Sequence, residues 1–274
     1  MPSRLRTLAA MLGLLLLLLA AGCGDGGTLT LATTTSTDNS GLLDELVPAF
    51  EQQSGVSVKV IAVGSGAAMV MGERGDVDVL LVHSPDAVDE FVAAGFGVER
   101  ARVMFNDFII AGSPSDPAGI AGGDDAVAAM IAIAEAGARF ISRGDDSGTH
   151  AKEKLLWTAA GLDVPSGADW YVETGQGMGA TLTVAAATSG YVLTDRATYL
   201  VVADGSALPL LISGDPQLRN IYDVIVVNPE RHDETNVDAA RAFRNYLLNA
   251  QTQNRIDRFG RDRFGQSLFT GDTE

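Results

Sequence analysis

Segments with the alternation of a β-strand are repeatedly followed, along this chain, by segments with the spacing of an amphipathic α-helix. Strands are predicted, in chain order, at residues 29–33, 56–63, 77–82, 103–112, 138–142, 170–174, 191–195, 208–213 and 222–228. Parallel neighbours in a sheet need a crossover, usually a helix, and the crossover helices then cover the faces of the sheet. The alternation therefore predicts an α/β protein with mostly parallel sheets, closed by a helix at about 237–259.

A loop rich in Ser, Pro, Asp and Gly, at residues 113–119, interrupts the alternation. A chain of 274 residues has room for one or two domains. A change of composition of this kind is typical of a crossing between domains. We therefore expect two lobes, with 29–112 and 206–274 forming lobe I and 113–205 forming lobe II.

The first 22 residues have the composition of an export signal rather than of a folded domain. Arg4 and Arg6 precede an apolar run at 8–19, and small residues then lead to Cys23, the single cysteine of the chain. This pattern resembles a bacterial lipoprotein signal, with Cys23 as the acylated residue and 23–28 as a tether. The alternative is an uncleaved anchor helix, but the apolar segment is short for a full membrane span.

The charge balance argues against nucleic acid as a partner. The chain has 19 basic and 35 acidic residues, which gives a formal net charge of −16. Proteins that bind nucleic acid present a basic surface, which this composition does not provide. A small anion is still possible as a ligand, because charges beyond about 10 Å are screened at moderate salt and local donors decide the affinity.

The segment 140–150 joins a strand end, a guanidinium and a helix start. Arg143 follows the predicted strand, and Ser147 and Thr149 stand where the next helix should begin. The first turn of a helix has free N–H groups and the positive end of the helix dipole, and arginine adds a planar fork of donors. This combination suits an anion, although an ordinary capped helix with its arginine paired to a neighbouring aspartate would have the same sequence.

Three other strand-to-helix junctions are rich in hydroxyl groups or glycine. Thr34, Thr35 and Ser36 follow the first strand, Ser65 follows the second, and 175–179 precede a predicted helix in lobe II. In open α/β sheets, ligands bind at the carboxyl ends of the strands. Each junction alone could be a capped helix, but two lobes that face each other would bring all four around one small anion.

Seven segments of the chain form a long, ordered and specific set. They are ATTTST at 32–37, VGSG at 63–66, GERGDVDVLLVH at 72–83, NDF at 106–108, SRGDDSGTH at 142–150, ETGQGMGATL at 173–182 and LTDR at 193–196. The sequence that carries them resembles the tungstate-binding lipoproteins of ABC uptake transporters, a branch of the type II periplasmic-binding-protein superfamily. The family usually has Thr at the position of Ser65, so the hydroxyl is retained, and Ala67 replaces a frequent Gln.

The resemblance implies the two-lobed type II fold, with each lobe a mostly parallel sheet flanked by helices, closing on a ligand like a hinge. It implies a binding protein and not an enzyme, which captures tungstate outside the cytoplasm and delivers it to a permease driven by an ATPase. We expect a monomer, anchored to the cell membrane through lipidated Cys23, in a periplasm or on a cell surface. No cofactor is expected besides the tungstate ligand.

A tetrahedral dianion without a proton at neutral pH needs a site that contains donors only. Charge-assisted bonds are expected from Arg143. Hydroxyl and backbone N–H donors are expected from a set of six residues, Thr34, Thr35, Ser36, Ser65, Ser147 and Thr149. Asp145 and Asp146 are expected to turn away and to pair with Arg143 or cap the helix, because an inward carboxylate would favour a protonated anion. Molybdate, sulfate and phosphate stay open as alternative ligands.

Two enzyme classes have partial support in the sequence. Gly175-x-Gly177-x-x-Ala180 fits a dinucleotide-binding loop, and Asp195 stands where a ribose ligand is expected, but an exported chain is separated from the cytoplasmic cofactors. A serine hydrolase would use Ser147 as its nucleophile, but the Gly-x-Ser-x-Gly spacing is absent.

The histidines do not form a predicted site. His150 is poorly placed as a base for Ser147, and His83, at the end of a buried strand, is interpreted as a structural histidine. His83, His150 and His232 are far apart in the sequence and lack the spacing of metal ligands, so no metal site is expected.

Overall fold

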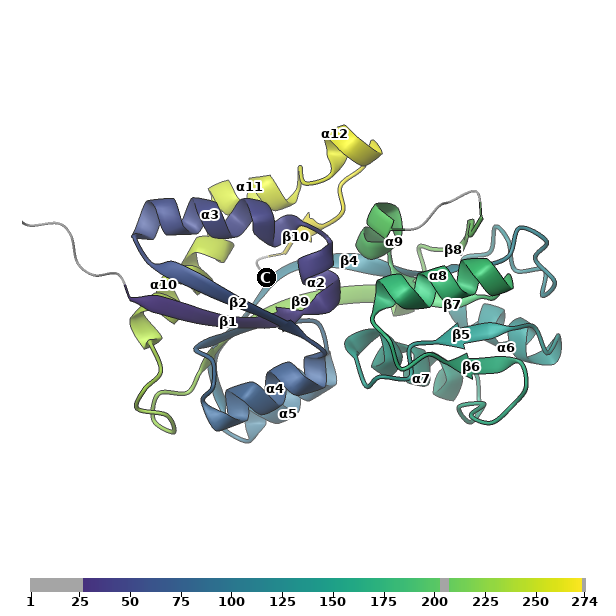
Figure 1. The fold of residues 1–274 in the computed structure, drawn as a ribbon, viewed down its shortest axis with the longest axis horizontal. Coiled ribbons are helices and arrows are strands. Elements are labelled where there is room, and N and C mark those ends of the chain that lie inside the picture. Colours follow the sequence, from purple (N-terminus) through teal and green to yellow (C-terminus); the bar gives the residue numbers. More distant parts are fainter. Residues whose placement is uncertain (1–26, 203–206, 273–274) are drawn as a thin grey trace, which may run out of the picture.

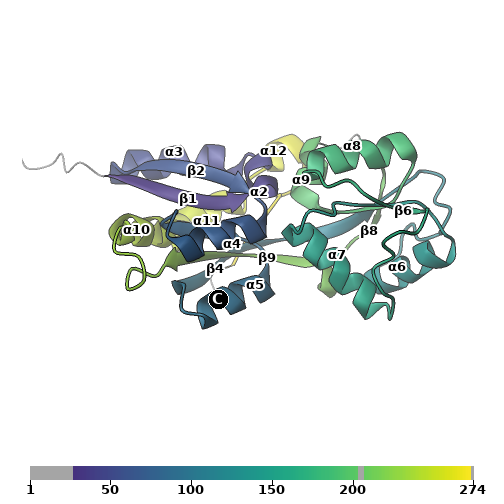
Figure 2. The same ribbon diagram turned by 60° about the horizontal axis from the view of Figure 1, so that its bottom comes forward.

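The computed structural model describes residues 27–202 and 207–272. The predicted signal at 1–22 and Cys23 lie outside these residues. Figures 1 and 2 show two lobes joined by a pair of strands, β4 (Gly97–Ala111) and β9 (Arg219–Val227). None of the helices in the described ranges combines the length and the apolar character needed to cross a bilayer.

Lobe I is built on a mixed sheet. Its strand order is β10 (Thr270–Gly271), β4, β9, β3 (Val79–Val82), β1 (Thr28–Thr34) and β2 (Ser57–Val63). β1 pairs in parallel with β2 and β3, whereas β9 runs antiparallel to both β3 and β4. The sheet is therefore mixed rather than mostly parallel, because β4 leaves the lobe and β9 returns to it in the opposite direction.

Helices cover both faces of this sheet (Figure 1). One core contains side chains of α3 (Leu42–Ser54), α10 (Val237–Leu248) and α11 (Ala250–Ile256), and the other contains those of α4 (Ser65–Arg74) and α5 (Pro85–Ala93). Alternate strand residues divide between the two cores, since Leu31 lies in the first and Ala32 in the second. Both faces are buried at the central strand β3, which explains why its four residues are all apolar.

Lobe II is built on the second half of β4, which pairs antiparallel with β7 (Val192–Asp195) and β8 (Leu210–Ile212). A parallel pair, β5 (Phe140–Ser142) and β6 (Tyr171–Glu173), lies beside them through a bridge between Phe140 and Tyr191. Four helices complete the lobe, α6 (Ala126–Glu135), α7 (Gly148–Ala159), α8 (Met178–Thr188) and α9 (Arg196–Val202). The lobe has one core on each side of β4, because Phe108 and Ile109 belong to different clusters.

The change from one lobe to the other takes place within the crossing strands. On β4, Met104 lies in the core of lobe I and Phe108 in that of lobe II. On the return, Leu218 lies in the core of lobe II and Tyr222 in that of lobe I. The crossing therefore lies at least five residues before 113 and twelve after 206, the divisions expected from the sequence, because strands that enter both cores make it.

The helix predicted at 237–259 is interrupted. Asn249 has an extended backbone, with ψ of 150°, and its side-chain oxygen accepts a hydrogen bond of 2.9 Å from the N–H of Thr252. Asparagine favours such caps because its side chain competes with the backbone for N–H groups. One helix therefore ends before Asn249 and a second begins after it. A further short helix, α12 (Arg261–Phe264), precedes β10.

Candidate functional site

Lobe I brings two helix starts to the carboxyl edge of its sheet. The short helix α2 (Thr35–Asn39) follows β1, and the hydroxyl of Thr34 caps it by accepting the N–H of Thr37 at 3.2 Å. The hydroxyls of Thr34 and Ser36 lie 3.1 Å apart, and both residues are buried, whereas Thr35 is half-buried. Ser65 is the first residue of α4 and is also buried. The hydroxyl-bearing residues predicted for lobe I therefore gather at the starts of two helices.

Lobe II contributes Arg143 and the start of α7. Arg143 follows β5 and is only 4% exposed, and its Nη2 donates a hydrogen bond of 2.5 Å to Oδ2 of Asp145. The hydroxyl of Ser147 accepts a backbone N–H of the first turn of α7, which makes Ser147 the N-cap. Thr149 lies in the same turn and is 1% exposed. The predicted residues of lobe II therefore surround one helix start.

Four buried atoms in this region have no hydrogen-bond partner in the part of the chain that the structure describes. They are Oγ of Ser65, Nδ1 of His83, Nε of Arg143 and Oγ1 of Thr149, of which the two hydroxyls and the guanidinium N–H are donors. A buried polar group without a partner costs roughly 1–3 kcal/mol, so native proteins leave few of them. One hydroxyl in lobe I, and one hydroxyl and one guanidinium in lobe II, therefore mark a place for a ligand that accepts hydrogen bonds.

His83, directly after β3, connects the two halves of this region. Its Nε2 lies 3.0 Å from Oγ of Ser36 and 3.1 Å from Oγ1 of Thr34. On its other side lies Gly148, the first residue of α7. A Cβ atom placed on Gly148 would be 3.0 Å from the carbonyl oxygen of His83 and 3.1 Å from its ring. The lobes are therefore in contact here, and the contact has no room for a side chain on Gly148.

A second close approach joins α4 to the loop that carries Arg143. A Cβ atom on Gly66 would lie 3.8 Å from the carbonyl oxygen of Asp146, across the two lobes. This distance is an ordinary van der Waals contact, so the start of α4 faces the loop before α7. Ser65 and Arg143 are thereby brought to the same region from different lobes.

Burial keeps His83 neutral. Desolvation is the main reason that the pKa of His83 falls to about 4; a contact with the side chain of Asn220 opposes this, and the positive charge of Arg143 adds to it. The ring packs on Tyr222, with 4.7 Å between the ring centroids. His83 was expected to be a structural histidine and not a neighbour of the site. Its position at the carboxyl end of β3, next to β1, was the signal for its place here.

The two aspartates of the loop have different partners. Asp145 pairs with Arg143, and its Oδ1 accepts the N–H of Ser147 at 3.2 Å. Asp146 has an 87% exposed side chain and pairs with Lys154 at 3.2 Å. Asp145 thus has both kinds of partner that were expected from the sequence, whereas Asp146 pairs with a lysine instead.

The junction at 175–179 supports the loop of Arg143 through its backbone. The N–H of Gly175 donates to the carbonyl oxygen of Arg143 at 2.8 Å. Asp195, the ribose ligand of the dinucleotide alternative, is fully buried and accepts the N–H of Thr198 at 2.8 Å. A buried helix cap is not accessible to a ribose, which argues against this alternative.

The hydrolase and metal alternatives also lack the necessary geometry. Nδ1 of His150 accepts the N–H of Asp146 at 3.1 Å, and the contact between His150 and Ser147 is made by the backbone of His150. The imidazole is therefore not bonded to the serine hydroxyl as a base would be. Among residues 27–202 and 207–272, no cluster of three or more His, Cys, Asp or Glu could hold a metal ion.

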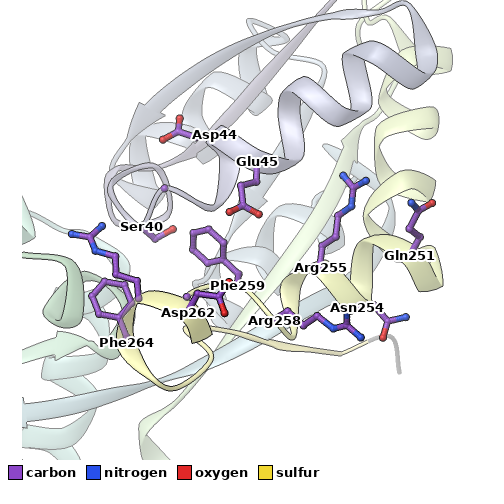
Figure 3. A pocket seen from close by; sticks show the side chains of 13 residues that line it. Ser40, Asp44, Glu45, Gln251, Asn254, Arg255, Arg258, Phe259, Asp262 and Phe264 are labelled. Carbon is purple, nitrogen blue, oxygen red and sulfur yellow. The ribbon is translucent and has the colours of Figure 1, made fainter.

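Lobe I also has an arginine-rich hollow, about 670 Å³ in volume, between α3 and the C-terminal helices (Figure 3). We call it the arginine groove, and its charged residues are Arg255, Arg258, Arg263, Asp44, Glu45 and Asp262. All six are exposed. Exposed charges are screened by water and salt, and the carboxylates repel anions, so the buried donors near His83 mark the better site for an oxyanion.

Comparison with known proteins agrees with this geometry. The PBP superfamily domain matches residues 21–251. The chain is 46% identical over 241 residues to the tungstate-binding protein TupA of Peptoclostridium acidaminophilum, covering 87% of this chain and 84% of that protein. Among solved structures, the tungstate-binding protein TupA of Desulfovibrio alaskensis G20 has a TM-score of 0.79 and 45% identity, over 90% of this chain and all of that one. The tungstate ABC transporter structure from Geobacter sulfurreducens has a TM-score of 0.77 and 46% identity, over 85% and 98% of the two chains.

Proposed function

The chain belongs to the PBP superfamily, in the group of tungstate-binding proteins of ABC transporters, and we propose that it captures tungstate and delivers it to an ABC permease. One observation of the structure carries the proposal. Three buried donors, from Ser65, Arg143 and Thr149, have no partner in the described part of the chain and come from both lobes. A ligand that accepts hydrogen bonds on all sides would satisfy the three together.

The chemistry of tungstate fits a site that contains donors only. As a dianion without a proton, tungstate can accept a hydrogen bond at each oxygen. The buried guanidinium of Arg143 would supply the charge-assisted bonds, which are about twice as strong as neutral ones. The starts of α4 and α7 would add backbone N–H groups and the positive ends of two helix dipoles.

The predicted ligand residues divide into two roles in this proposal. Ser65, Arg143 and Thr149 would bind the oxyanion through their side chains. Thr34 and Ser147 cap helices, so the main role of their hydroxyls would be to hold the helix starts in position, and not to bind the ligand. Thr35 and Ser36, in the first turn of α2, would complete the lobe I side of the site.

The partners of Asp145 bear on the choice of anion. Its two carboxylate oxygens are bonded to Arg143 and to the N–H of Ser147. Phosphate is partly protonated near pH 7 and gains from an acceptor in its site, whereas tungstate does not. We infer that the site disfavours phosphate. Molybdate and sulfate are also full dianions, so they stay as alternatives that only the size of the closed site can exclude.

The contact of His83 with Gly148 suggests how the ligand is held. We propose that tungstate completes the closure of the lobes, because each lobe leaves donors unsatisfied until the other meets the ligand. A single chain contains both halves of the site, which is consistent with a monomer. Binding followed by release, without catalysis and without a cofactor, would be its whole activity.

We propose that the protein acts outside the cytoplasm. The predicted signal at 1–22 leads us to propose that Cys23 is acylated and tethers the protein to the cell membrane, in a periplasm or on a cell surface. Several acyl chains on one residue hold a protein firmly, whereas a single chain gives only reversible binding. Mass spectrometry of the membrane-extracted protein tests this part separately.

Titration calorimetry with tungstate, molybdate, sulfate and phosphate tests the proposed ligand. The chain without residues 1–23 should bind tungstate at least a hundredfold more tightly than phosphate. Arg143→Ala should weaken tungstate binding by at least a hundredfold, while Arg255→Ala, in the arginine groove, should change it less than twofold. A preference for phosphate, or no binding of any of the four anions, would contradict the proposal.

A further inference from the structure

The arginine groove differs from the rest of this acidic chain in its charge. Three arginines line it, at 255, 258 and 263, and Arg261 falls within the same nine positions, although the whole chain has only 19 basic residues and a net charge of −16. All four are exposed. None forms an ion pair within the described residues, where the ion-paired arginines are Arg100, Arg143, Arg196 and Arg241.

Two of the four arginines are held by neutral neighbours. Arg261 donates to Oγ of Ser267 at 2.7 Å, and the guanidinium of Arg263 lies 4.9 Å from the centre of the Phe264 ring. For the side chains of Arg255 and Arg258, the described part of the chain provides neither an ion pair nor a hydrogen bond. Their donors are therefore available to a partner.

The groove also offers apolar surface. The rings of Phe259 and Phe264 are half-buried and belong to its lining. Figure 3 shows Phe259 projecting between two walls, one formed by α3 with Glu45 and the other by α11 and the turn after it, with Arg255 and Arg258. A partner with both carboxylate and apolar side chains matches this lining, and a free inorganic anion does not.

The groove adjoins the segment that leads from the oxyanion site. Ser40 and Gly41, which line it, follow α2 directly. The hydroxyl of Ser40 donates to the carbonyl oxygen of Thr37 at 2.6 Å, and a Cβ atom on Gly41 would lie 3.8 Å from the Phe259 ring. Both views place α12 at the end of lobe I that is nearest to α9 of lobe II (Figures 1 and 2). A partner in the groove would therefore sit close to both lobes.

We propose that the arginine groove is the docking surface for an acidic segment of the ABC permease, an inference that rests on the proposed function. Arginine forms bidentate bonds with carboxylates and, with aromatic residues, is enriched in protein interfaces. Most of this protein repels an acidic partner, so the groove would also determine the orientation in which the two associate.

An anionic membrane is the other acidic surface near such a protein. It fits the groove less well, because a bilayer surface is flat at this scale and the arginines line a hollow. A protruding protein segment can enter the hollow and reach the arginines that line it.

The test measures ATP hydrolysis by the permease–ATPase complex of the same transporter, in nanodiscs of zwitterionic lipid, as tungstate-loaded protein is added. The test variant is Arg255→Glu with Arg258→Glu. The matched control is Lys59→Glu with Arg74→Glu, which makes the same change of charge at two exposed residues elsewhere on lobe I. One member of each pair is closely matched, because Arg255 and Arg74 each lie in the last turn of a helix.

The concentration of test variant that gives half-maximal stimulation should rise at least tenfold, and that of the control less than twofold. Arg255→Gln with Arg258→Gln, which introduces no new charge, should give a smaller rise in the same direction. Tungstate affinity, measured by calorimetry, should stay within twofold of wild type in all three. The calorimetry separates the two proposals. If the wild-type protein does not bind tungstate, the proposed function is contradicted, and not the docking proposal.

Equal behaviour of the test and control variants would overturn the docking proposal, whether both stimulate normally or both fail. The series is repeated in nanodiscs that contain phosphatidylglycerol. A defect of the test variant that appears only in those nanodiscs would identify the membrane as the occupant and would also overturn it.

Discussion

Arg143 in the oxyanion site and Arg258 in the arginine groove carry the same charge in opposite surroundings. Arg143 is 4% exposed, has one carboxylate partner and keeps a buried N–H without a partner in the described residues. Arg258 is exposed, near two other arginines and three carboxylates. Water and salt weaken the attraction of the exposed groups, whereas a buried, oriented donor acts at low dielectric. Fixed donors, and not the number of charges, should therefore decide where tungstate binds.

The largest effect is expected from Arg143→Lys, which keeps the charge and removes the planar fork. Lysine cannot bond to Asp145 and to the ligand with the same geometry. Hydrogen bonds of charged groups contribute roughly 1.5–3 kcal/mol, so tungstate should bind at least tenfold more weakly in calorimetry. Arg258→Lys, as the exposed counterpart, should change the affinity less than twofold. Equal effects at the two positions would remove the distinction between the two regions.

The next effect concerns the buried histidine beside Arg143. Its pKa in the folded protein, about 4, is below the ordinary value of 6.5, so the unfolded chain binds more protons between these values. Stability should therefore fall as the pH is lowered through 6.5 toward 4. The contribution of His83 between pH 7 and pH 4.5 should be about 2 kcal/mol by linkage.

Urea unfolding at the two pH values measures this contribution, with His83→Gln as the comparison. The variant should lose about 2 kcal/mol less than wild type on acidification, because its side chain does not titrate. A wild type and variant with the same loss would show that His83 is not the group responsible.

A smaller effect is expected from Gly148→Ala, which tests the contact between the lobes. The added Cβ would lie 3.0 Å from a backbone carbonyl of the other lobe, so α7 must move away from His83. A shift of a few tenths of an ångström relieves this contact, and we expect tungstate to bind about tenfold more weakly, since a displacement of 1 Å can reduce the effect of a positioned group by about a hundredfold. Gly179→Ala, on α8, is the control, because its nearest neighbour would be a side-chain atom at 3.6 Å. Small-angle scattering, at a tungstate concentration that just saturates the wild type, should show less contraction for Gly148→Ala than for Gly179→Ala.

The smallest effect is expected from Ser65→Ala. This variant is informative because affinity should fall while the melting temperature of the ligand-free protein should not. With ligand, the variant loses one neutral hydrogen bond, about 1 kcal/mol or roughly fivefold in affinity. Without ligand, it loses a buried hydroxyl that has no partner in the described chain, so its melting temperature should not fall. A lower melting temperature of the ligand-free variant would show that Ser65 has a structural partner and is not reserved for the anion.

The sequence predicts the elements of this fold well, because local periodicity determines them. The first strand was expected at 29–33 and is Thr28–Thr34, and the second was expected at 56–63 and is Ser57–Val63. The direction of the strands was harder to predict, because pairing such as that between β4 and β9 depends on residues that are distant in the sequence. The prediction of the closing helix ran across Asn249. An asparagine within a helical pattern does not reveal whether its side chain forms a hydrogen bond with the solvent or with the backbone.

The residues expected for the site are brought to one region by the structure, while their binding of an anion stays a prediction, and His83 is a neighbour that the sequence did not reveal. Hydroxyls, glycines and an arginine at strand ends are visible in the sequence, because their position relative to a helix start is local. The role of His83 is not local, since its partners Thr34 and Ser36 lie 49 and 47 positions away. A buried histidine in a core and one that holds ligand hydroxyls have the same sequence pattern. That Arg143 and its neighbours bind the anion stays a prediction that the substitutions above can test.

β4 gives its side chains to the cores of both lobes, and this has a consequence for how the protein melts. A strand of 15 residues that is part of two sheets cannot leave one of them without disturbing the other. The lobes are therefore expected to unfold in one cooperative calorimetric transition, and amide protons at the centre of β4 should exchange only through global unfolding. Neither lobe can be cut out as an independent unit, since each would lose a strand and expose a bare sheet edge.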